Sequence, residues 1–401
     1  MATSHSRTDV AIALEDRYGA RIYRPLDVVL ERGDGCWVFD AEGRRYLDCL
    51  SAYSAANFGH SNPLLVAAAA EQMGKIALTS RAFRNAELPG FLQALCTTFG
   101  FEMALPMNTG AEAVETAIKA ARKWAYEVKH VPAESAEIIV CGNNFHGRTI
   151  AVVGFSSEPA YRRSFGPFAP GFKTVPYGDA DGLRGAMSER TAAFLVEPIQ
   201  GEAGVIVPPD GYLRQALEAC RERRALFIAD EIQTGLGRTG ELLACDHEGV
   251  RPDIAVVGKS LGGGLYPVSA VLAAREILGL FQPGDHGSTF AGNPLAAAIG
   301  RAVLQLLEDA ELLSRVKARG RRLVTALEGF ASPIVREVRG RGLMIGIELT
   351  TPARPVCERL ARAGVLCKET HGTVLRLTPP LTLDGETAEW LLARLATALE
   401  A

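Results

Sequence analysis

Two residues with complementary chemistry, Asp230 and Lys259, each close an apolar run of the sequence. Asp230 ends the segment 225–230 (ALFIAD), and Lys259 ends the segment 253–259 (DIAVVGK) and precedes a glycine-rich loop. Both segments predict buried strands, and the ligands of an open α/β sheet bind at the edge where such strands end. We therefore expect a carboxylate and an amine to face one ligand at that edge.

This pair matches the needs of pyridoxal phosphate. The aldehyde of that cofactor condenses with a lysine amine, and its ring nitrogen takes an acidic partner. Lys259 must then be able to lose its proton, which requires desolvation or a nearby positive charge. Taken alone, however, a lysine at a strand end is usually solvated, and an aspartate there is often a helix cap. The surrounding motifs decide between these interpretations.

A helix N-terminus suited to phosphate is predicted within 107–119 (MNTGAEAVETAIK). Thr109 and Glu112 form a capping-box pattern, and apolar residues then recur at helical spacing. Gly110 therefore falls at the start of the helix, where free backbone N–H groups and the helix dipole bind phosphate. The alternative is an ordinary capped helix.

Four further side chains could contact a flat ring or a substrate. Phe145 and Arg148 follow a predicted strand, where an aromatic ring can stack and an arginine can bind a carboxylate through two hydrogen bonds. Glu202 falls in a loop at the same sheet edge. Arg376 lies in an apolar run, and because a buried arginine needs a partner, Glu202 or a substrate carboxylate could pair with it. Singly, a core phenylalanine, a surface arginine and a solvated carboxylate are the commoner outcomes.

Hydroxyl groups and glycines complete the set of candidate residues. The segment 286–294 (HGSTFAGNP) carries Ser288 and Thr289, whose hydroxyls could donate to phosphate. The three glycines at 262–264 lack the spacing of a nucleotide-binding loop. They allow a tight backbone turn after Lys259.

The chain divides into three predicted parts. Residues 1–50 predict a short helix and an antiparallel hairpin over 36–48. Over 51–290, helices alternate with short apolar strands, which predicts a large α/β domain with a mainly parallel sheet. Residues 291–401 predict a smaller α+β domain that packs with the N-terminal segment. We expect helices at 63–77, 86–100, 111–129, 210–224, 294–329 and 353–363, and strands at 136–141, 149–155, 192–197, 225–230, 254–258, 267–273, 334–339, 343–349 and 374–378.

Composition narrows the classes of partner. The net charge of −3 gives no electrostatic case for nucleic acid or an anionic membrane. No stretch approaches the roughly 20 apolar residues of a membrane span, and the first ten residues lack the apolar core of a secretory signal. The eight cysteines form no CxxC pair and the seven histidines show no metal-ligand spacing. We expect a cytoplasmic enzyme without a metal.

Long strings of the sequence resemble one family. The chain is similar to the class III (ω-) group of fold type I pyridoxal-phosphate-dependent aminotransferases over about residues 23–380. The strings that carry the resemblance are SAYSAANFGH (51–60), LTSRAF (78–83), PMNTGAEAVETAIKAARKWAY (106–126), NNFHGRT (143–149), FGPFAPGF (165–172), VEPIQGEAG (196–204), LFIADEIQTGLGRTG (226–240), RPDIAVVGKSLGGGLYPVSAVL (251–272), HGSTFAGNPL (286–295) and VLRLTPPL (374–381).

The resemblance implies a fold and a set of cofactor contacts. The fold is a large domain with a mainly parallel seven-stranded sheet and a smaller domain built from both ends of the chain. Lys259 binds the cofactor covalently and shuttles protons, and Asp230 pairs with the ring nitrogen. Phe145 stacks on the ring, and Gln233 contacts its hydroxyl. The phosphate is held by Gly110 and Ala111 and, from the partner subunit of a homodimer or larger assembly with shared active sites, by Ser288 and Thr289.

The resemblance also implies two substrates. Ornithine gives up its δ-amine to 2-oxoglutarate, which yields glutamate and glutamate 5-semialdehyde, and the semialdehyde cyclises to pyrroline-5-carboxylate. Such a reaction belongs to arginine, ornithine and proline metabolism. Arg148 takes the α-carboxylate of ornithine and Tyr53 its α-amine, while Glu202 neutralises Arg376 until 2-oxoglutarate arrives.

Three positions depart from the family strings, and other activities stay open. Phe58 stands where glutamine is common, Arg84 where an aromatic residue or histidine is usual, and Ala291 where glycine is usual. We expect Phe58 and Arg84 near the substrate mouth, although Arg84 could simply be solvated. The alternatives are an ω-aminotransferase for N-acetylornithine or 4-aminobutyrate, an aminomutase on the same fold, and a binding module without catalysis.

Overall fold

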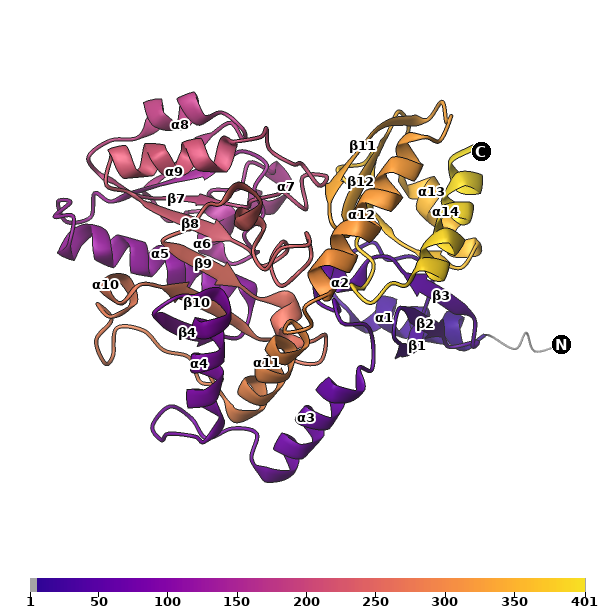
Figure 1. Ribbon diagram of the computed structural model, residues 1–401, viewed down its shortest axis with the longest axis horizontal. Helices are drawn as coiled ribbons and strands as arrows, with labels where there is room; N and C mark the ends of the chain where they lie inside the picture. Colours follow the sequence, from indigo (N-terminus) through magenta and orange to yellow (C-terminus); the bar gives the residue numbers. More distant parts are fainter. Residues whose placement is uncertain (1–5, 401) are drawn as a thin grey trace.

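The computed structural model describes residues 6–400, which form two lobes side by side (Figure 1). The larger lobe contains a seven-stranded sheet of order β4-β10-β9-β8-β7-β5-β6. Only β10 runs antiparallel to its neighbours, and the other pairs are parallel. The strands are β4 (Met103–Met107), β5 (Glu137–Cys141), β6 (Phe172–Val175), β7 (Thr191–Val196), β8 (Leu226–Asp230), β9 (Ile254–Val257) and β10 (Ser269–Ala273).

Helices cover both faces of this sheet. On one face α5 (Gly110–Glu127) packs its apolar side, including Val114 and Trp124, on the strands. On the other face α9 (Tyr212–Glu222) packs on β8, and α8 (Ala180–Ala186) packs on α9 and β6. All residues of β5, β7, β8, β9 and β10 are buried, which explains their nearly continuous apolar sequences.

Three longer helices and several short ones complete the larger lobe. The helices α3 (Pro63–Lys75), α4 (Glu87–Phe99) and α11 (Pro294–Leu306) pack against one another. The short elements are α2 (Ser51–Ser54), α6 (Ile150–Gly154), α7 (Pro159–Arg162), α10 (Arg275–Leu278) and the 3-10 turns η1 (Ala244–Glu248) and η2 (Lys259–Gly262). Among residues 6–400, no helix has both the length and the apolar character to cross a bilayer.

The smaller lobe combines the two ends of the chain. Its antiparallel sheet has the order β11-β12-β15-β14, and a second sheet has the order β1-β2-β3-β13. Because β13 pairs with β3, the C-terminal part is bonded to the N-terminal part. The elements are α1 (Arg7–Tyr18), β1 (Leu30–Asp34), β2 (Trp37–Asp40), β3 (Arg45–Asp48), α12 (Leu312–Glu328), β11 (Val335–Arg341), β12 (Met344–Leu349), α13 (Arg354–Arg362), β13 (Val365–Leu366), β14 (Lys368–Thr370), β15 (Val374–Leu377) and α14 (Gly385–Glu400).

The predicted fold class is confirmed, with local corrections. The predicted strand at 149–155 is wrong: this segment holds α6, whose Val152 and Val153 are buried. A short apolar run does not distinguish a strand from a buried helical turn. The predicted helix at 294–329 is two helices, which separate near Asp309, where that carboxylate accepts the Glu311 N–H at 2.9 Å.

Several elements were not predicted, and the domain boundaries are untested. The strands without a prediction are β1, β4, β6, β13 and β14, and the helices are α2, α7, α8, α10 and α14, with the 3-10 turns η1 and η2. Edge strand β6 is half polar and β4 contains a proline, so neither has a strong strand pattern. The boundaries at residues 50 and 290 stay a prediction. Residues 1–5 of the first predicted part and residue 401 of the last lie outside the described residues.

Candidate active site

Asp230 and Lys259 line the same cavity at the C-terminal edge of the parallel strands. Asp230 ends β8, Lys259 follows the neighbouring strand β9, and the cavity between them measures about 230 Å³. Its walls are formed by Gly110, Ala111, Phe145, His146, Gly147, Glu197, Ile199, Asp230, Ile232, Gln233 and Lys259. The structure therefore brings six of the eight predicted cofactor-binding residues into one cavity.

The carboxylate of Asp230 is buried and paired with a histidine. Its Oδ2 atom lies 2.7 Å from His146 Nδ1, and its Oδ1 atom accepts the Ile232 N–H at 3.1 Å. Burial opposes the protonation of His146, but the hydrogen bond and negative charge of Asp230 outweigh it and raise the pKa of His146. His146 is therefore a buried hydrogen-bond partner of Asp230. The sequence did not predict this partner.

A second buried carboxyl group, Glu197, was also missed. It follows β7 directly and accepts the Phe145 N–H at 2.9 Å. Burial raises the pKa of Glu197 to about 8; the nearby charge of His146 opposes this shift, and that of Asp230 adds to it. Glu197 can therefore hold a proton near neutral pH. Its place after a buried strand is the signal that identified Asp230, and it could have identified Glu197 too.

Lys259 has the properties of an amine that can act as a nucleophile. Burial lowers the pKa of Lys259 to about 8, with the charge of Glu202 opposing the shift and that of Arg376 adding to it. A substantial fraction of the amine is therefore neutral near physiological pH, as bond formation to an aldehyde requires. The left-handed backbone of Lys259 (φ 46°) starts the turn η2 and directs the chain away from β9.

The N-terminus of α5 forms one wall of the cavity. The predicted capping box is present: Thr109 Oγ1 accepts the Glu112 N–H at 3.3 Å, and Glu112 Oε2 accepts the Thr109 N–H at 2.7 Å. Within the described part of the chain, the N–H groups of Gly110 and Ala111 have no acceptor. Two free amides at a helix start form an anion site.

Close backbone packing brings the start of α5 against the loop that carries Phe145 and Gly147. A Cβ on Gly147 would lie 2.8 Å from the Ala111 side chain, so only glycine fits there. The ring of Phe145 meets Tyr161 edge-on, with centroids 6.1 Å apart. The guanidinium of Arg148 lies 3.5 Å from the centre of the Tyr161 ring, so an arginine stands at the aromatic side of the site.

A buried ion pair borders the cavity on the side of the smaller lobe. Arg376 lies in the middle of β15 and is 1% exposed. Its Nη1 atom donates to Glu202 Oε1 at 2.7 Å, and its Nη2 atom donates to Gln233 Oε1 at 2.8 Å. Burial would raise the pKa of Glu202, but the charges of Arg376 and Lys259 outweigh it and lower that pKa. Glu202 is therefore ionised and neutralises Arg376.

A tyrosine stands beside this ion pair. The Tyr53 ring centre lies 5.5 Å from Arg376 Cζ. Burial raises the pKa of Tyr53, and the charge of Glu202 adds to the shift. The exposed Tyr23 makes a smaller contribution to the same shift. Tyr23 was not predicted, because it lies in an irregular segment without a recognisable pattern.

Some predicted residues lie elsewhere. Ser288 and Thr289 do not line the cavity: Ser288 Oγ accepts from Asn108 Nδ2 at 2.9 Å, and Thr289 is exposed. Their reach into a partner subunit stays a prediction. Phe58 is 4% exposed and belongs to the core, so the expectation that it lies near the substrate mouth is wrong. Arg84 is exposed, as the solvated alternative allowed.

The donor set of the cavity fits pyridoxal phosphate. An amine of lowered pKa, a buried carboxylate, a free helix N-terminus and an aromatic ring all line the same enclosed space. Lys259 would hold the aldehyde carbon and Asp230 the ring nitrogen, with Gly110 and Ala111 at the phosphate.

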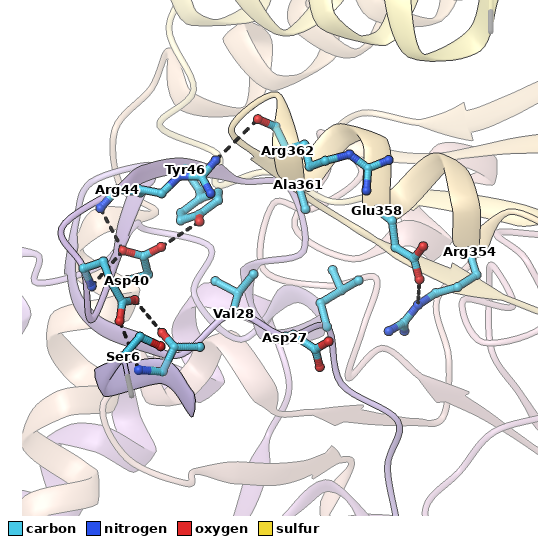
Figure 2. Close-up of a pocket in the computed structure, with 13 residues that line it drawn as sticks. Ser6, Asp27, Val28, Asp40, Arg44, Tyr46, Arg354, Glu358, Ala361 and Arg362 are labelled. Carbon is cyan, nitrogen blue, oxygen red and sulfur yellow. Dashed lines mark hydrogen bonds and ion pairs between the residues drawn. The ribbon is translucent and has the colours of Figure 1, made fainter. Parts of the chain in front are cut away.

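A second cavity lies between the N-terminal segment and α13 (Figure 2). It measures about 590 Å³ and is lined by side chains that pair with one another. Asp40 accepts from the Tyr46 hydroxyl at 2.7 Å, and Arg354 Nε donates to Glu358 at 3.0 Å (Figure 2). Among the described residues, no lysine lines this second cavity.

Comparisons with known proteins agree with this site. Residues 18–399 match the family model described as aminotransferase class III. The chain is 54% identical to the ornithine aminotransferase of Bacillus subtilis over 397 residues, which is 99% of each protein. It superposes with a TM-score of 0.96 on the ornithine aminotransferase of Toxoplasma gondii, solved with partial occupancy of PLP at its active site; the identity is 41%, and 98% of this chain and 94% of that chain are covered.

A solved relative of different name is also similar. The acetylornithine aminotransferase of Elizabethkingia anophelis is 45% identical, with a TM-score of 0.90 over 98% of this chain and 99% of that chain. The family model covers nearly the whole chain, and these relatives exceed 30% identity over nearly its full length. The chain belongs to the class III aminotransferases.

Proposed function

We propose that this protein is a pyridoxal-phosphate-dependent enzyme that transfers the δ-amino group of L-ornithine to 2-oxoglutarate. The products are L-glutamate and glutamate 5-semialdehyde, which cyclises to pyrroline-5-carboxylate. The observation that carries the proposal is the ion pair between Glu202 and Arg376, 2.7 Å long, beside the cavity of Lys259. One site must accept a substrate with one carboxylate and then a substrate with two, and an arginine with a removable partner can serve both.

The residues around Lys259 would carry the proton transfers. When bound, pyridoxal phosphate supplies an aldehyde for the donor amine and a ring that withdraws electrons from the reacting carbon. Lys259 is placed to remove and return the proton at that carbon, because its pKa of about 8 is close to working pH. Asp230, which lies 2.7 Å from His146, would pair with the ring nitrogen and favour its protonated form.

The orientation of ornithine follows from the charges at the other end of the site. Ornithine must present its δ-amine to Lys259, so its α-carboxylate and α-amine must bind away from it. We assign the α-carboxylate to Arg148 and the α-amine to Tyr53. While Glu202 neutralises Arg376, that arginine does not attract the α-carboxylate, and the α-amine does not reach the reacting position. When 2-oxoglutarate binds, its two carboxylates take Arg376 and Arg148.

The main competing function is the transamination of N-acetylornithine, since the similar Elizabethkingia anophelis protein is an acetylornithine aminotransferase. A free α-amine needs a polar partner and an acetylated one does not. Tyr53, half-buried and next to Glu202, provides such a partner. We therefore favour ornithine.

Initial rates with each donor test the proposal. Purified protein reconstituted with pyridoxal phosphate is given 2-oxoglutarate and either ornithine or N-acetylornithine, and the consumption of the donor is measured together with the L-glutamate that either donor forms. An aldehyde reagent that reports the cyclic imine then identifies the product of ornithine. We expect faster turnover of ornithine, strict dependence on 2-oxoglutarate, and no turnover by Lys259→Ala. Faster turnover of N-acetylornithine would overturn the choice of donor. Turnover without 2-oxoglutarate would instead indicate an aminomutase.

The assembly and setting belong to the same proposal. We infer a homodimer in which Ser288 and Thr289 reach the phosphate site of the partner subunit, in a cytoplasmic enzyme of ornithine and proline metabolism. Within each chain, we infer domains at 51–290 and 291–401, with the N-terminal segment packed on the latter. Sedimentation of the purified protein, which should give the mass of two chains, checks the assembly.

A further inference from the structure

A turn of left-handed helix stands next to the ion pair of the site. Four consecutive residues of α2 have positive φ angles: Ser51 at 48°, Ala52 at 47°, Tyr53 at 60° and Ser54 at 73°. None of them is glycine, asparagine or aspartate, the residues that tolerate this conformation. Figure 1 shows α2 at the junction of the two lobes. A run of four such residues is a conformation that the local sequence opposes.

The side chains of the turn do not stabilise it. The hydroxyl groups of Ser51 and Ser54 are buried, and neither has a hydrogen-bond partner among residues 6–400. The Ala55 N–H donates a hydrogen bond of 2.8 Å to the Ser51 carbonyl, which closes one helical turn. Strained backbone persists only where the surrounding structure determines it, so the cause lies outside the turn.

Asp48 holds the start of the turn. Its Oδ1 atom accepts the N–H groups of Leu50 at 2.9 Å and Ser51 at 2.8 Å. Its Oδ2 atom lies 2.7 Å from His60 Nε2. The His60 backbone is itself bonded to Gly35 through two hydrogen bonds of 3.0 and 2.8 Å. The carboxylate of Asp48 therefore connects the start of the turn to a fixed part of the smaller lobe.

Thr378 ties the same turn to the strand that carries Arg376. The Thr378 N–H donates to the Cys49 carbonyl at 2.7 Å, and the Thr378 hydroxyl donates to the Leu50 carbonyl at 2.8 Å. Thr378 follows Arg376 by two positions and is fully buried. The strand therefore fixes both Arg376 and the backbone from which Tyr53 projects over it, 5.5 Å away.

We propose that Asp48, His60 and Thr378 are positioning residues that hold the left-handed turn, so that the Tyr53 phenol has one fixed place beside Arg376 for recognising the donor's α-amine. The inference rests on the proposed function, because it assigns a substrate contact to Tyr53. Without these anchors the turn would open and let Tyr53 leave Arg376. If the anchors served only the fold, removing one would change stability and leave the choice of donor intact.

A pair of donors isolates the contact in question. 5-Aminopentanoate is ornithine without its α-amine, so the ratio of kcat/KM for ornithine to that for 5-aminopentanoate reports the value of α-amine recognition. The holoenzyme is assayed with each donor and 2-oxoglutarate. Tyr53→Phe should lower this ratio about tenfold or more, because it removes a hydrogen bond to a charged group.

A control variant relieves the strain of the turn without removing an anchor. Ala52→Gly places glycine at φ 47°, where it is unstrained, so the melting temperature should stay the same or rise. Because glycine favours the same backbone angles and Asp48, His60 and Thr378 still hold the turn, the donor ratio should stay close to that of the wild type. Glu134→Gly is the matched control: it relieves a φ of 59° in an exposed turn far along the chain and should leave the ratio unchanged.

Removal of an anchor should act through Tyr53. Asp48→Asn should lower the donor ratio, and it should have no further effect on the ratio in the Tyr53→Phe background. An unchanged ratio in Asp48→Asn would overturn the inference, as would an equal additional loss when Asp48→Asn is made in the Tyr53→Phe background. Failure of the wild-type protein to use ornithine would instead overturn the proposed function, so the two failures are distinguishable.

Discussion

The two ends of the site are built in different ways. At the cofactor end, Glu197, Asp230 and Lys259 each follow a strand of one buried parallel sheet, and their positions are set by the register of β7, β8 and β9. At the substrate end, Glu202 and Arg376 are 174 residues apart in the chain and come from different lobes. Tyr53 comes from a third segment, which is held in a strained turn.

Because of this difference, the residues that act on the reacting carbon and the residues that select the substrate lie on separate parts of the fold. A continuous sheet cannot shift one strand end without breaking its hydrogen-bond ladder, so the groups that act on the reacting carbon are rigid. The groups that select the substrate sit at the junction of two lobes and change with any change in their packing. Variants of the cofactor end should therefore affect all donors equally, and variants of the substrate end should affect one donor more than another.

The largest expected effect comes from breaking the cofactor end. Asp230→Asn removes the negative charge that pairs with His146 and that would keep the ring nitrogen protonated. We expect kcat/KM to fall by roughly a thousandfold, and by the same factor for ornithine and for 5-aminopentanoate. Steady-state kinetics with both donors check this.

A carboxylate at the opposite edge of the sheet, directly before the neighbouring strand β9, gives the control. Asp253 accepts the Phe227 N–H at 2.8 Å and pairs with Arg221. Asp253→Asn should reduce stability slightly and leave turnover unchanged. A fall for ornithine alone in Asp230→Asn would contradict the proposed separation of the two ends.

The second effect comes from breaking the substrate end. Glu202→Ala leaves Arg376 buried without its ion pair, and that arginine then attracts the α-carboxylate of a donor. We expect the preference for δ-amines over α-amines to fall by about ten- to a hundredfold, measured as the kcat/KM ratio for ornithine over an α-amino acid such as alanine. Glu337→Ala removes an exposed carboxylate that pairs with Arg339 and serves as the control.

The proposal that Glu202 neutralises Arg376 while ornithine binds depends on that ratio. If Glu202→Ala retained the wild-type preference, neutralisation of Arg376 would not determine which amine reacts. A loss of turnover with every donor would equally contradict it, because it would place Glu202 among the groups that act on the reacting carbon.

The same difference explains which residues the sequence could predict. Asp230 and Lys259 were found because an apolar run with a charged end is a local pattern, and Thr109 and Glu112 because a capping box is local. The bond between Glu202 and Arg376 was anticipated from the need of a buried arginine for a partner. His146 and Tyr23 were missed because only the folded chain brings them to Asp230 and Tyr53.

The errors in the predicted fold have a similar origin. The segment 149–155 has apolar residues that suit either a strand or a helical turn, and its packing in the folded chain decides for the helix α6. Phe58 was expected near the substrate from a departure in a family string, yet it fills the core. The left-handed turn at 51–54 runs against the preferences of its own residues, so no local pattern indicates it.

The smallest expected effect is that of the Glu202 charge, at the substrate end, on the pKa of Lys259 at the cofactor end. Only the neutral amine of Lys259 condenses with an aldehyde, and burial lowers the pKa of Lys259 to about 8. The rate at which apoprotein takes up pyridoxal phosphate should therefore rise about tenfold per pH unit below 8 and level off above it, whereas an ordinary lysine would level off near pH 10.4. The charge of Glu202 favours the protonated amine, so Glu202→Gln should move the midpoint to lower pH. Absorbance during reconstitution measures both midpoints, and an unchanged or higher midpoint in Glu202→Gln would show that the charge at the substrate end does not reach Lys259.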